Sequence, residues 1–372
     1  MRARVALLTL LTVAATGCDS GAGSGSGEPP EVAFTKIDLP AGAEPVLLST
    51  AKDVLLVGVR REGAPVVPGL LRRGADGTLA EIPLTPGSPY GKLARWYSIV
   101  SDGDRVVAIG GERGGAHANV RWSAWTGSLA GLTEQPQGFS VFGGQGAGEL
   151  ADAVLTPAGP VLVGSWENAT RGGLDLAVWT NSGPDWVRQS SAGTALESTP
   201  DKLGLPIAAT ALEPGVLVAG WQLIGGNQVP AVWRSASGAT GWTTTALPDS
   251  GRTGAAMAVR CWGSACAVAG RVDDKLALWR YSGDAWTRLP DVPPVPVGDK
   301  DHLVAPVEID GQTSQVYADG DTVRIARTDG RTWTVRTAAG PTGAVTAAIT
   351  AGDALYLVAG QTLWRADLAA LR

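Results

Sequence analysis

The stretch LAVWTNSGPDW, from Leu176 to Trp186, places one tryptophan on each side of a turn that contains glycine. Related stretches follow it: PAVWRSASGATGW begins at Pro230, LALWRYSGDAW at Leu276, and the weaker copy RIARTDGRTW at Arg324. Short apolar runs on both sides of a glycine turn are typical of β-hairpins. The recurrence therefore predicts one hairpin that is repeated in several units of the chain.

Two more apolar runs precede these hairpins, and a Gly, Pro or Asp turn separates the two runs. The later run of each pair is KDVLLVGV at Lys52, GDRVVAIGG at Gly103, AGPVLVGS at Ala158, PGVLVAGW at Pro214, SACAVAGR at Ser264 or GDALYLVAG at Gly352. Short runs rich in β-branched residues between turns predict strands. Each unit therefore has four short strands, and the degenerate stretch HLVAPVEIDG, from His302, opens a seventh unit.

The predicted third strand marks the repeat most clearly, because most units carry tryptophan there. The equivalent positions are Leu71, Trp122, Trp179, Trp233, Trp279, Ala326 and Trp364. Four strands in every roughly 40 to 55 residues are the sequence signature of β-propeller blades. We therefore predict an all-β fold in which residues 31–372 form a single seven-bladed β-propeller, with four antiparallel strands in each blade.

The two ends of the repeat region are complementary fragments of one blade. The last unit runs out after its third strand, TLWRADLAALR, whereas VAFTKIDLPAG at residues 32–42 matches the fourth strand of other units. An N-terminal strand that completes the last blade leaves no open seam in the ring. We therefore expect residues 32–40 to form the outer strand of the last blade.

Nine of the 14 tryptophans occupy repeat positions in the third and fourth strands, and a large aromatic side chain suits the wedge between two blades. These nine are Trp122, Trp179, Trp186, Trp233, Trp242, Trp279, Trp286, Trp333 and Trp364. We expect them to be structural and to pack between neighbouring blades.

The N-terminus has the pattern of a secretory leader. MRARVALLTLLTVAATGCDS combines a basic start, an apolar stretch from Val5 to Ala15 and small residues before Cys18. That stretch is too short for a spanning helix, which takes about 20 residues. Residues 15–18, ATGC, resemble the bacterial lipobox, in which the cysteine is lipidated and becomes the new N-terminus.

These features predict the organisation of the first 30 residues. Residues 1–17 are expected to be a lipoprotein signal peptide, and residues 18–30 the lipidated Cys18 followed by a flexible Gly/Ser/Pro tether. The protein would then be extracytoplasmic, with the lipid on Cys18 anchoring it to the outer face of the cell membrane. An ordinary leader peptidase also accepts Ala-x-Gly, so plain secretion is the alternative.

The other two cysteines lie on either side of a four-residue turn in AVRCWGSACAVAG. Cys261 and Cys266 can then face each other across a hairpin, within disulfide range, and an oxidising location would allow the bond. A zinc site needs more ligands than His117 and His302, the only histidines, can add. We predict a disulfide between Cys261 and Cys266, no metal site and no cofactor.

Charge narrows the class of partner. The net charge is −5 and no basic stripe is present, which argues against nucleic acid. The chain is apolar enough to build a core, with 17% charged residues.

The hairpins WTNSGPDW, WRYSGDAW and RTDGRTW resemble the Asp-box of sialidase-like propellers, a Ser-x-Asp-x-Gly-x-Thr-Trp turn. The Gly and the final Trp match, whereas the Asp position holds Asn181, Tyr281 or Thr328, so the box is degenerate. The catalytic residues of sialidases do not carry over: in FTKIDLP, Lys36 and Asp38 stand where that family has Arg and Pro. As a whole the chain resembles bacterial β-propeller lipoproteins of the actinobacterial kind.

A ligand site is expected on the face that carries the loops between second and third strands. The residues just past each second strand align as Arg60, Glu112, Trp166, Trp221 and Arg271, with Gln361 in the last unit. Connections between blades add Tyr90, Trp96, Phe139 and Phe142 to this face. Aromatic rings with Arg and Glu on one rim suit a glycan or a peptide, although the two tryptophans of the rim would also fill gaps between loops.

Two function classes remain open. The first is an envelope-anchored, non-catalytic module that binds a protein or a glycan or scaffolds a surface complex, and we favour it because no catalytic motif is recognised. The second is an extracellular carbohydrate-active hydrolase or lyase. Such an enzyme uses scattered carboxylates that leave no local motif, and it should place two of them across the channel mouth.

Overall fold

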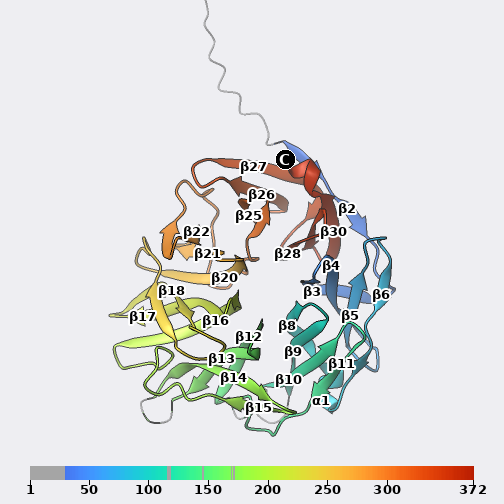
Figure 1. Cartoon of the computed structure of the whole chain (residues 1–372). Coiled ribbons are helices and arrows are strands. Elements are labelled where there is room, and N and C mark those ends of the chain that lie inside the picture. The colour runs from blue at the N-terminus through green and yellow to red at the C-terminus, as the bar shows by residue number, and fades with distance from the viewer. Residues whose placement is uncertain (1–29, 115–118, 145, 169, 171) are drawn as a thin grey trace, which may run out of the picture.

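A computed structural model describes residues 30–372, apart from residues 115–118, 145, 169 and 171. The described chain forms seven antiparallel β-sheets arranged in a ring around a central channel, and the sheets follow one another in sequence order (Figure 1). The predicted seven-bladed β-propeller is therefore confirmed. The predicted signal peptide, the lipidation site Cys18, most of the tether and His117 lie outside the described residues.

The first four blades each contain four consecutive antiparallel strands. Blade 1 has β3 (Ala43–Ala51), β4 (Val54–Arg61), β5 (Pro68–Arg73) and β6 (Leu79–Glu81). Blade 2 has β8 (Arg95–Asp102), β9 (Arg105–Gly114), β10 (Asn119–Ser128) and β11 (Gly131–Gln135), with the short β7 (Leu84–Thr85) added parallel to β11. Blade 3 has β12 (Gly148–Thr156), β13 (Gly159–Glu167), β14 (Leu174–Ser182) and β15 (Asp185–Arg188). Blade 4 has β16 (Lys202–Leu212), β17 (Gly215–Ile224), β18 (Asn227–Arg234) and β19 (Thr243–Ala246).

The last three blades complete the ring. Blade 5 has β20 (Gly254–Trp262), β21 (Ala265–Val272), β22 (Lys275–Ser282) and β23 (Ala285–Arg288). Blade 6 has β24 (Val307–Ile309), β25 (Gln312–Asp319), β26 (Thr322–Thr328) and β27 (Trp333–Thr342). Blade 7 has β28 (Val345–Ala351), β29 (Ala354–Ala359) and β30 (Thr362–Asp367). The described residues also form two short helices: α1 (Pro89–Leu93), capped by the Ser88 hydroxyl, and the 3-10 helix Leu368–Leu371.

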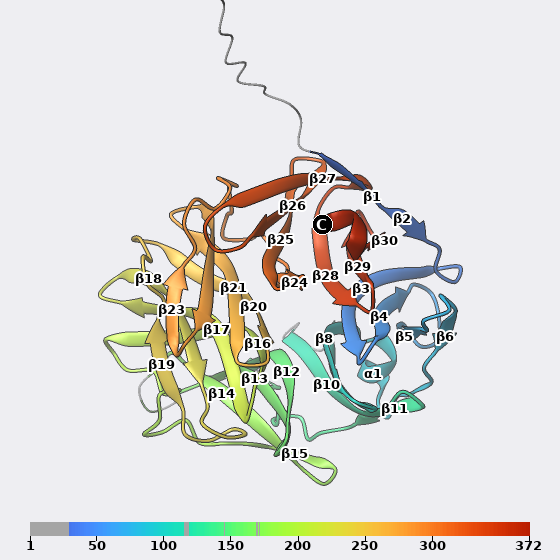
Figure 2. The same ribbon diagram turned by 45° about the horizontal axis from the view of Figure 1, so that its top comes forward.

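The N-terminal segment closes the ring by pairing with two blades. β2 (Thr35–Ile37) is antiparallel to β30 and supplies the fourth strand of blade 7, as the sequence predicts. β1 (Glu31–Ala33) is parallel to β27 and adds a fifth strand to blade 6, so residues 32 and 33 do not belong to the last blade as predicted. The two N-terminal strands therefore lie along the outer edge of the C-terminal blades (Figure 2).

The first strand of six blades carries a β-bulge near the same height. The bulged residues are Val46, Tyr97, Ala151, Ile207, Met257 and Thr346. All but Val46 line the central cavity. In blades 3 to 5 the residue of the second strand opposite the bulge is glycine, and a Cβ on Gly220, for example, would overlap the carbonyl oxygen of Leu205. In blades 3 to 5 the glycine near the end of the second-strand motif is therefore required by the bulge.

Seven apolar clusters hold the ring together, one at each boundary between neighbouring blades. The third-strand tryptophans are central to them: Trp179, Trp233 and Trp279 are fully buried. The indole N–H of Trp279 donates to the carbonyl of Pro248 in the connection from the preceding blade, at 2.8 Å. These contacts confirm that the repeat tryptophans pack between blades.

One of the nine repeat positions was assigned to the wrong residue. Trp125 occupies the same register position in blade 2 as Trp179 does in blade 3, because Trp125 pairs with Ala108 and Trp179 pairs with Leu162. Trp122 instead pairs with Gly111, near the start of its strand. Trp125 is fully buried and Trp122 is only partly buried. The structural tryptophan of blade 2 is therefore Trp125, and Trp122 is left to another role.

Blade 6 is the least regular blade, as the degenerate stretch from His302 predicts. Its first strand, β24, has three residues, and Leu303 to Ala305 line the channel without strand structure. The side-chain amide of the buried Gln315 donates to the Val304 carbonyl at 3.1 Å and so replaces a missing backbone bond. Its third strand has Ala326 where the regular blades have tryptophan.

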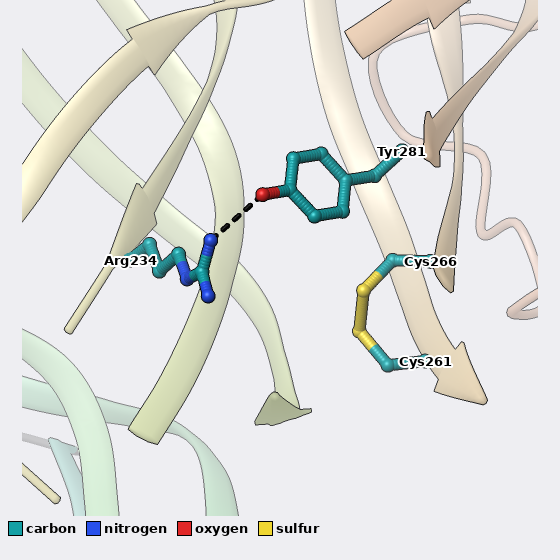
Figure 3. The surroundings of a disulfide bond; sticks show 4 residues. All are labelled: Arg234, Cys261, Cys266 and Tyr281. Atoms are coloured by element: carbon teal, nitrogen blue, oxygen red, sulfur yellow. Dashed lines mark hydrogen bonds between the residues drawn. A yellow bond between two sulfur atoms is a disulfide. The ribbon is translucent and has the colours of Figure 1, made fainter. Parts of the chain in front are cut away.

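The strand directions give the ring two distinct faces. We call the face with the turns between second and third strands and the connections between blades the upper face; the lower face carries the other hairpin turns. The predicted disulfide joins Cys261 and Cys266 in the lower-face hairpin between β20 and β21. Beside it, Tyr281 accepts a hydrogen bond from Arg234 of blade 4 at 2.7 Å (Figure 3).

Within the described part of the chain, none of the helices has the length and apolar character needed to cross a membrane.

Candidate functional site

The five rim residues predicted from the sequence lie at the upper ends of second strands, inside the strands rather than just past them. Their equivalence is wrong in part, because the bulge sets the register. Arg60, Trp221 and Arg271 directly follow the residue opposite the bulge, whereas Glu112 and Trp166 lie one residue further on. Successive side chains of a strand point to opposite sides, so the five do not form one ring of equivalent groups.

Three of the five are spread around blades 1, 4 and 5. Arg60 forms an ion pair with the exposed Glu62 at 2.8 Å. Trp221 is partly buried. Arg271 is only 5% exposed and forms ion pairs with Asp274, at 3.1 Å, and Asp299.

Arg271 also donates to the side-chain carbonyl of Gln228, in blade 4, at 2.9 Å. Its partner Asp299 belongs to the charged loop DKDH at residues 299–302. The guanidinium of Arg271 therefore ties this loop and blade 4 to blade 5.

The other two rim residues lie in the neighbouring blades 2 and 3. Glu112 is the cross-strand neighbour of Arg121 and forms an ion pair with Arg95 at 3.4 Å. Trp166 packs at the edge of the apolar cluster between these blades, and the Arg188 guanidinium lies 4.4 Å from its ring centroid. Burial lowers the pKa of Arg188, although the charge of Asp175 acts in the opposite direction.

A pocket of about 320 Å³ opens on the upper face of blade 2, beside its connection to blade 3. We call it the aromatic groove, after the four rings in its wall: Tyr90, Trp122, Phe139 and Phe142. Tyr90 comes from α1, Trp122 from β10, and the two phenylalanines from the connection to blade 3. Phe139 is 58% exposed, an unusual exposure for a large apolar ring.

Arg121 organises the aromatic groove. Its guanidinium lies 4.6 Å from the centroid of the Phe139 ring and 6.0 Å from that of Tyr90, and it donates to the backbone carbonyl of Gly144. Cation–π contacts of this kind hold aromatic rings and a positive charge side by side. The groove therefore presents flat apolar faces next to a cationic donor.

A buried carboxylate fixes the other wall of the groove. Glu134, at the end of β11, accepts hydrogen bonds from the backbone N–H groups of Gly87 and Ser88, at 2.7 and 2.8 Å, and from the Ser88 hydroxyl. Ser88 also caps α1, which carries Tyr90. Because its oxygens are engaged, Glu134 positions the helix and does not offer a free charge to a ligand.

The central channel contains a second cavity, of about 460 Å³, lined by first strands. Among its described lining residues, Asp152 is the only carboxylate. Asp152 accepts hydrogen bonds from the Ser98 hydroxyl of blade 2 and from the backbone N–H groups of Ala153 and Ala209, the last from blade 4. Burial raises the pKa of Asp152 to about 6, and these three hydrogen bonds oppose the shift.

The hairpin of blade 6 shows how the degenerate Asp-box turn is held. The Thr328 hydroxyl, at the position of the box's Asp, accepts from the Gly330 N–H at 2.9 Å. The neighbouring Asp329 accepts from the N–H groups of Thr332 and Arg331, and these bonds lower its pKa. The turn is thus self-contained and structural.

Metal-ligating side chains do not gather in the part of the chain that the structure describes: no group of three or more His, Cys, Asp or Glu residues could hold an ion there.

Sequence reasoning found part of the aromatic groove and missed its centre. Tyr90, Phe139 and Phe142 were expected on this face, but Trp122 was assigned to the core and Arg121 was not singled out. The available signal was the second tryptophan of RWSAWTG: two tryptophans three residues apart on one strand point to opposite sides of the sheet, so only one can fill the core position. The other, Trp122, is available to the groove.

Comparisons with known proteins bear on the fold. Neither the models of known protein families nor the curated protein sequences contain a match to this sequence. Among solved structures, the chain is similar to a virginiamycin B lyase from Staphylococcus aureus in complex with quinupristin, with a TM-score of 0.55 and 13% identity over 90% of this chain and 98% of that one.

Two further solved structures have TM-scores of 0.50 and 10% identity. One is the polysaccharide lyase Uly1, covering 91% of this chain and 92% of the other. The other is YCF48 bound to a D1 peptide, covering 91% of this chain and 99% of the other. At such low identity these similarities establish the β-propeller fold and carry no information about the ligand.

Proposed function

We propose that the protein is a non-catalytic binding module and that it holds a glycan in the aromatic groove of blade 2. The observation that carries the proposal is the exposed Phe139 ring stacked with the Arg121 guanidinium in a pocket of about 320 Å³. The apolar faces of sugar rings stack on aromatic side chains, and Arg121 would donate hydrogen bonds to hydroxyl or carboxylate groups of the glycan. Pockets of this size accept small ligands.

We extend the site to the two rim residues that lie nearby. Glu112 is the cross-strand neighbour of Arg121, and Trp166 packs against the same apolar cluster as Trp122 and Phe142. The proposed site has an outer rim formed by Arg60, Trp221 and Arg271. The charge of Arg271 is already paired with Asp274 and Asp299. A large glycan or an envelope protein would reach them.

Glycan-array binding of the whole chain and of single variants tests this proposal. Phe139→Ala removes an exposed ring with little effect on the core. We expect Phe139→Ala and Arg121→Ala each to weaken glycan binding at least about tenfold. Trp262→Ala, which removes a partly buried ring in the lower-face hairpin of blade 5, is the matched control outside the rim and should bind as the wild type does. Wild-type binding by the Phe139 and Arg121 variants would move the site away from the groove.

The alternative is a carbohydrate-active hydrolase or lyase, and the observation in its favour is Asp152 in the channel. A carboxyl group with a pKa near 6 suits a general acid. Glycoside hydrolysis usually requires a second carboxylate about 5 to 9.5 Å away, and the described lining of the channel contains Asp152 alone. Cleavage of a bound glycan that is lost in Asp152→Asn would favour the enzyme.

We also propose that the lipid on Cys18 anchors the propeller to the outer face of the cell membrane. β1 runs parallel to β27 toward the upper face, so the chain enters the ring from the side of the lower face. An anchor at Cys18 would therefore leave the aromatic groove directed away from the membrane. Cys18→Ala should release the protein or leave an uncleaved precursor, whereas normal processing and membrane fractionation of this variant would contradict the anchor.

A further inference from the structure

The channel holds a guanidinium that has no counter-ion among the described residues. Arg260, near the lower end of β20, points into the central cavity together with the apolar side chains of Met257, Leu303 and Ile349. It donates to the carbonyl of Pro306, from blade 6, at 3.2 Å and to that of Ala348, from blade 7, at 3.1 Å. In the described part of the chain, no carboxylate lies within ion-pair distance of it.

Arg271, whose side chain is buried, differs from Arg260 in its partners. Arg271, eleven residues further along the same hairpin, has two carboxylates and an amide oxygen as partners. A guanidinium has five N–H groups, and Arg260 uses two of them on carbonyls. The other three find no acceptor among the described residues. Burial without a counter-ion also lowers the pKa of Arg260 to about 10, which leaves it charged at neutral pH.

We propose that the lower half of the channel is a binding site for a small organic monocarboxylate, held by Arg260. The two carbonyl bonds to different blades fix the plane of the guanidinium, so its free N–H groups form a fork of the kind that binds a carboxylate through two parallel hydrogen bonds. The cavity of about 460 Å³ has room for an apolar tail against Met257, Leu303 and Ile349. This site is separate from the aromatic groove.

The second charge in the channel defines the ligand further. The titratable groups among the described lining residues are Tyr97, Asp152 and Arg260. Asp152 already accepts hydrogen bonds from Ser98, Ala153 and Ala209, so its carboxyl group does not require a cationic group on the ligand. When Asp152 is ionised, its charge disfavours a ligand that carries more than one negative charge. A monoanion with an uncharged tail meets both conditions.

Isothermal titration of the whole chain with hexanoate, hexanol and hexylamine tests the proposal, because these probes share one tail and differ in head group. We expect hexanoate to bind with a Kd below about 5 mM, and the alcohol and the amine at least about tenfold more weakly. Arg260→Met should lose binding by about tenfold or more, and Arg260→Lys, which keeps the charge without the fork, by less. Arg252→Met, at an exposed arginine in the connection that precedes β20, and Phe139→Ala, in the aromatic groove, should bind as the wild type does.

The head-group series needs only the wild type, so it decides the question even if Arg260→Met folds poorly. Equal binding of hexanoate and hexanol, or no hexanoate binding at about 10 mM, would overturn the proposal and leave Arg260 as a strap between blades 5, 6 and 7. Hexanoate binding that survives in a folded Arg260→Met variant would overturn it as well.

Discussion

Blades 3 to 5 and the seam formed by blades 6 and 7 are held together in different ways. Each of the three regular blades has its own four strands, a bulge opposite a glycine and a buried third-strand tryptophan. The seam has a three-residue inner strand in blade 6, Ala326 in place of tryptophan, and two strands borrowed from the N-terminus. The regular blades thus depend on local sequence, whereas the seam depends on pairing between opposite ends of the chain.

The largest effect is expected from breaking the seam. Deleting residues 31–40 removes β1 and β2 and uncovers the apolar cluster that buries Val32 and Phe34. Loss of these two core side chains alone costs about 5 kcal/mol or more, and two sheet edges become exposed. Thermal unfolding of this deletion, beside one of residues 19–29 as the control, measures the effect. Equal melting temperatures for the two deletions would show that the seam does not depend on the N-terminus.

The regular blades are tested by adding a single methyl group. In Gly220→Ala the new Cβ would overlap the Leu205 carbonyl across the bulge, so we expect a loss of about 2 to 3 kcal/mol in unfolding free energy. Blade 7 has Ala359 at the corresponding position, and Ala359→Gly should cost only about 1 kcal/mol.

The control for added volume is Gly138→Ala, where a Cβ would meet only Val141 at 3.8 Å and should change the stability by less than about 0.5 kcal/mol. Urea unfolding of the three variants separates the effects. A Gly220→Ala variant as stable as Gly138→Ala would contradict the steric role of the bulge glycine.

Asp152 holds part of the inner wall of the ring together, because its hydrogen bonds join blades 2, 3 and 4. Its pKa in the folded state is about 6, above the ordinary value of 3.8 in an unfolded chain. The contribution of this group to stability is therefore fully present below about pH 4 and is lost as pH rises through 6, by about 2 to 3 kcal/mol.

The measurement is the unfolding free energy of the wild type relative to Asp152→Asn, whose side chain does not titrate, between pH 4 and 7.5. The difference should change by about 2 to 3 kcal/mol in favour of the variant as pH rises. A difference that stays constant across this range would show that the pKa of Asp152 is not raised.

Much of the fold could be predicted from sequence because the regular blades repeat a local pattern. Three local features are enough to define seven blades. They are the hairpins around Trp179 and Trp279, the glycines near the ends of the second strands, and the matching fragments at the two ends of the repeat region. The strand β1 was missed because EVA at residues 31–33 is short and pairs parallel with a strand some 300 residues away, which no local pattern encodes.

The candidate sites were harder to predict, for a physical reason. A one-residue difference in distance from the bulge places a side chain on the opposite side of its blade. This separates Trp166, two residues after Gly164, from Trp221, which directly follows Gly220. Arg121 and Arg260 stand out only once their neighbours are known. One has aromatic rings around it, the other has no carboxylate, and neither property can be read from the residues next to it in sequence.

The smallest effect is expected from the disulfide, since it joins residues that a regular hairpin already holds together. Cys261 and Cys266 are cross-strand partners five residues apart, so the bond restricts only a short loop of the unfolded chain, worth roughly 2 kcal/mol. Reductant should lower the melting temperature of the wild type by a few degrees and leave Cys261→Ala/Cys266→Ala unchanged. A fall as large as that caused by deleting β1 and β2 would mean that local cross-links, and not the seam, limit the stability of the ring.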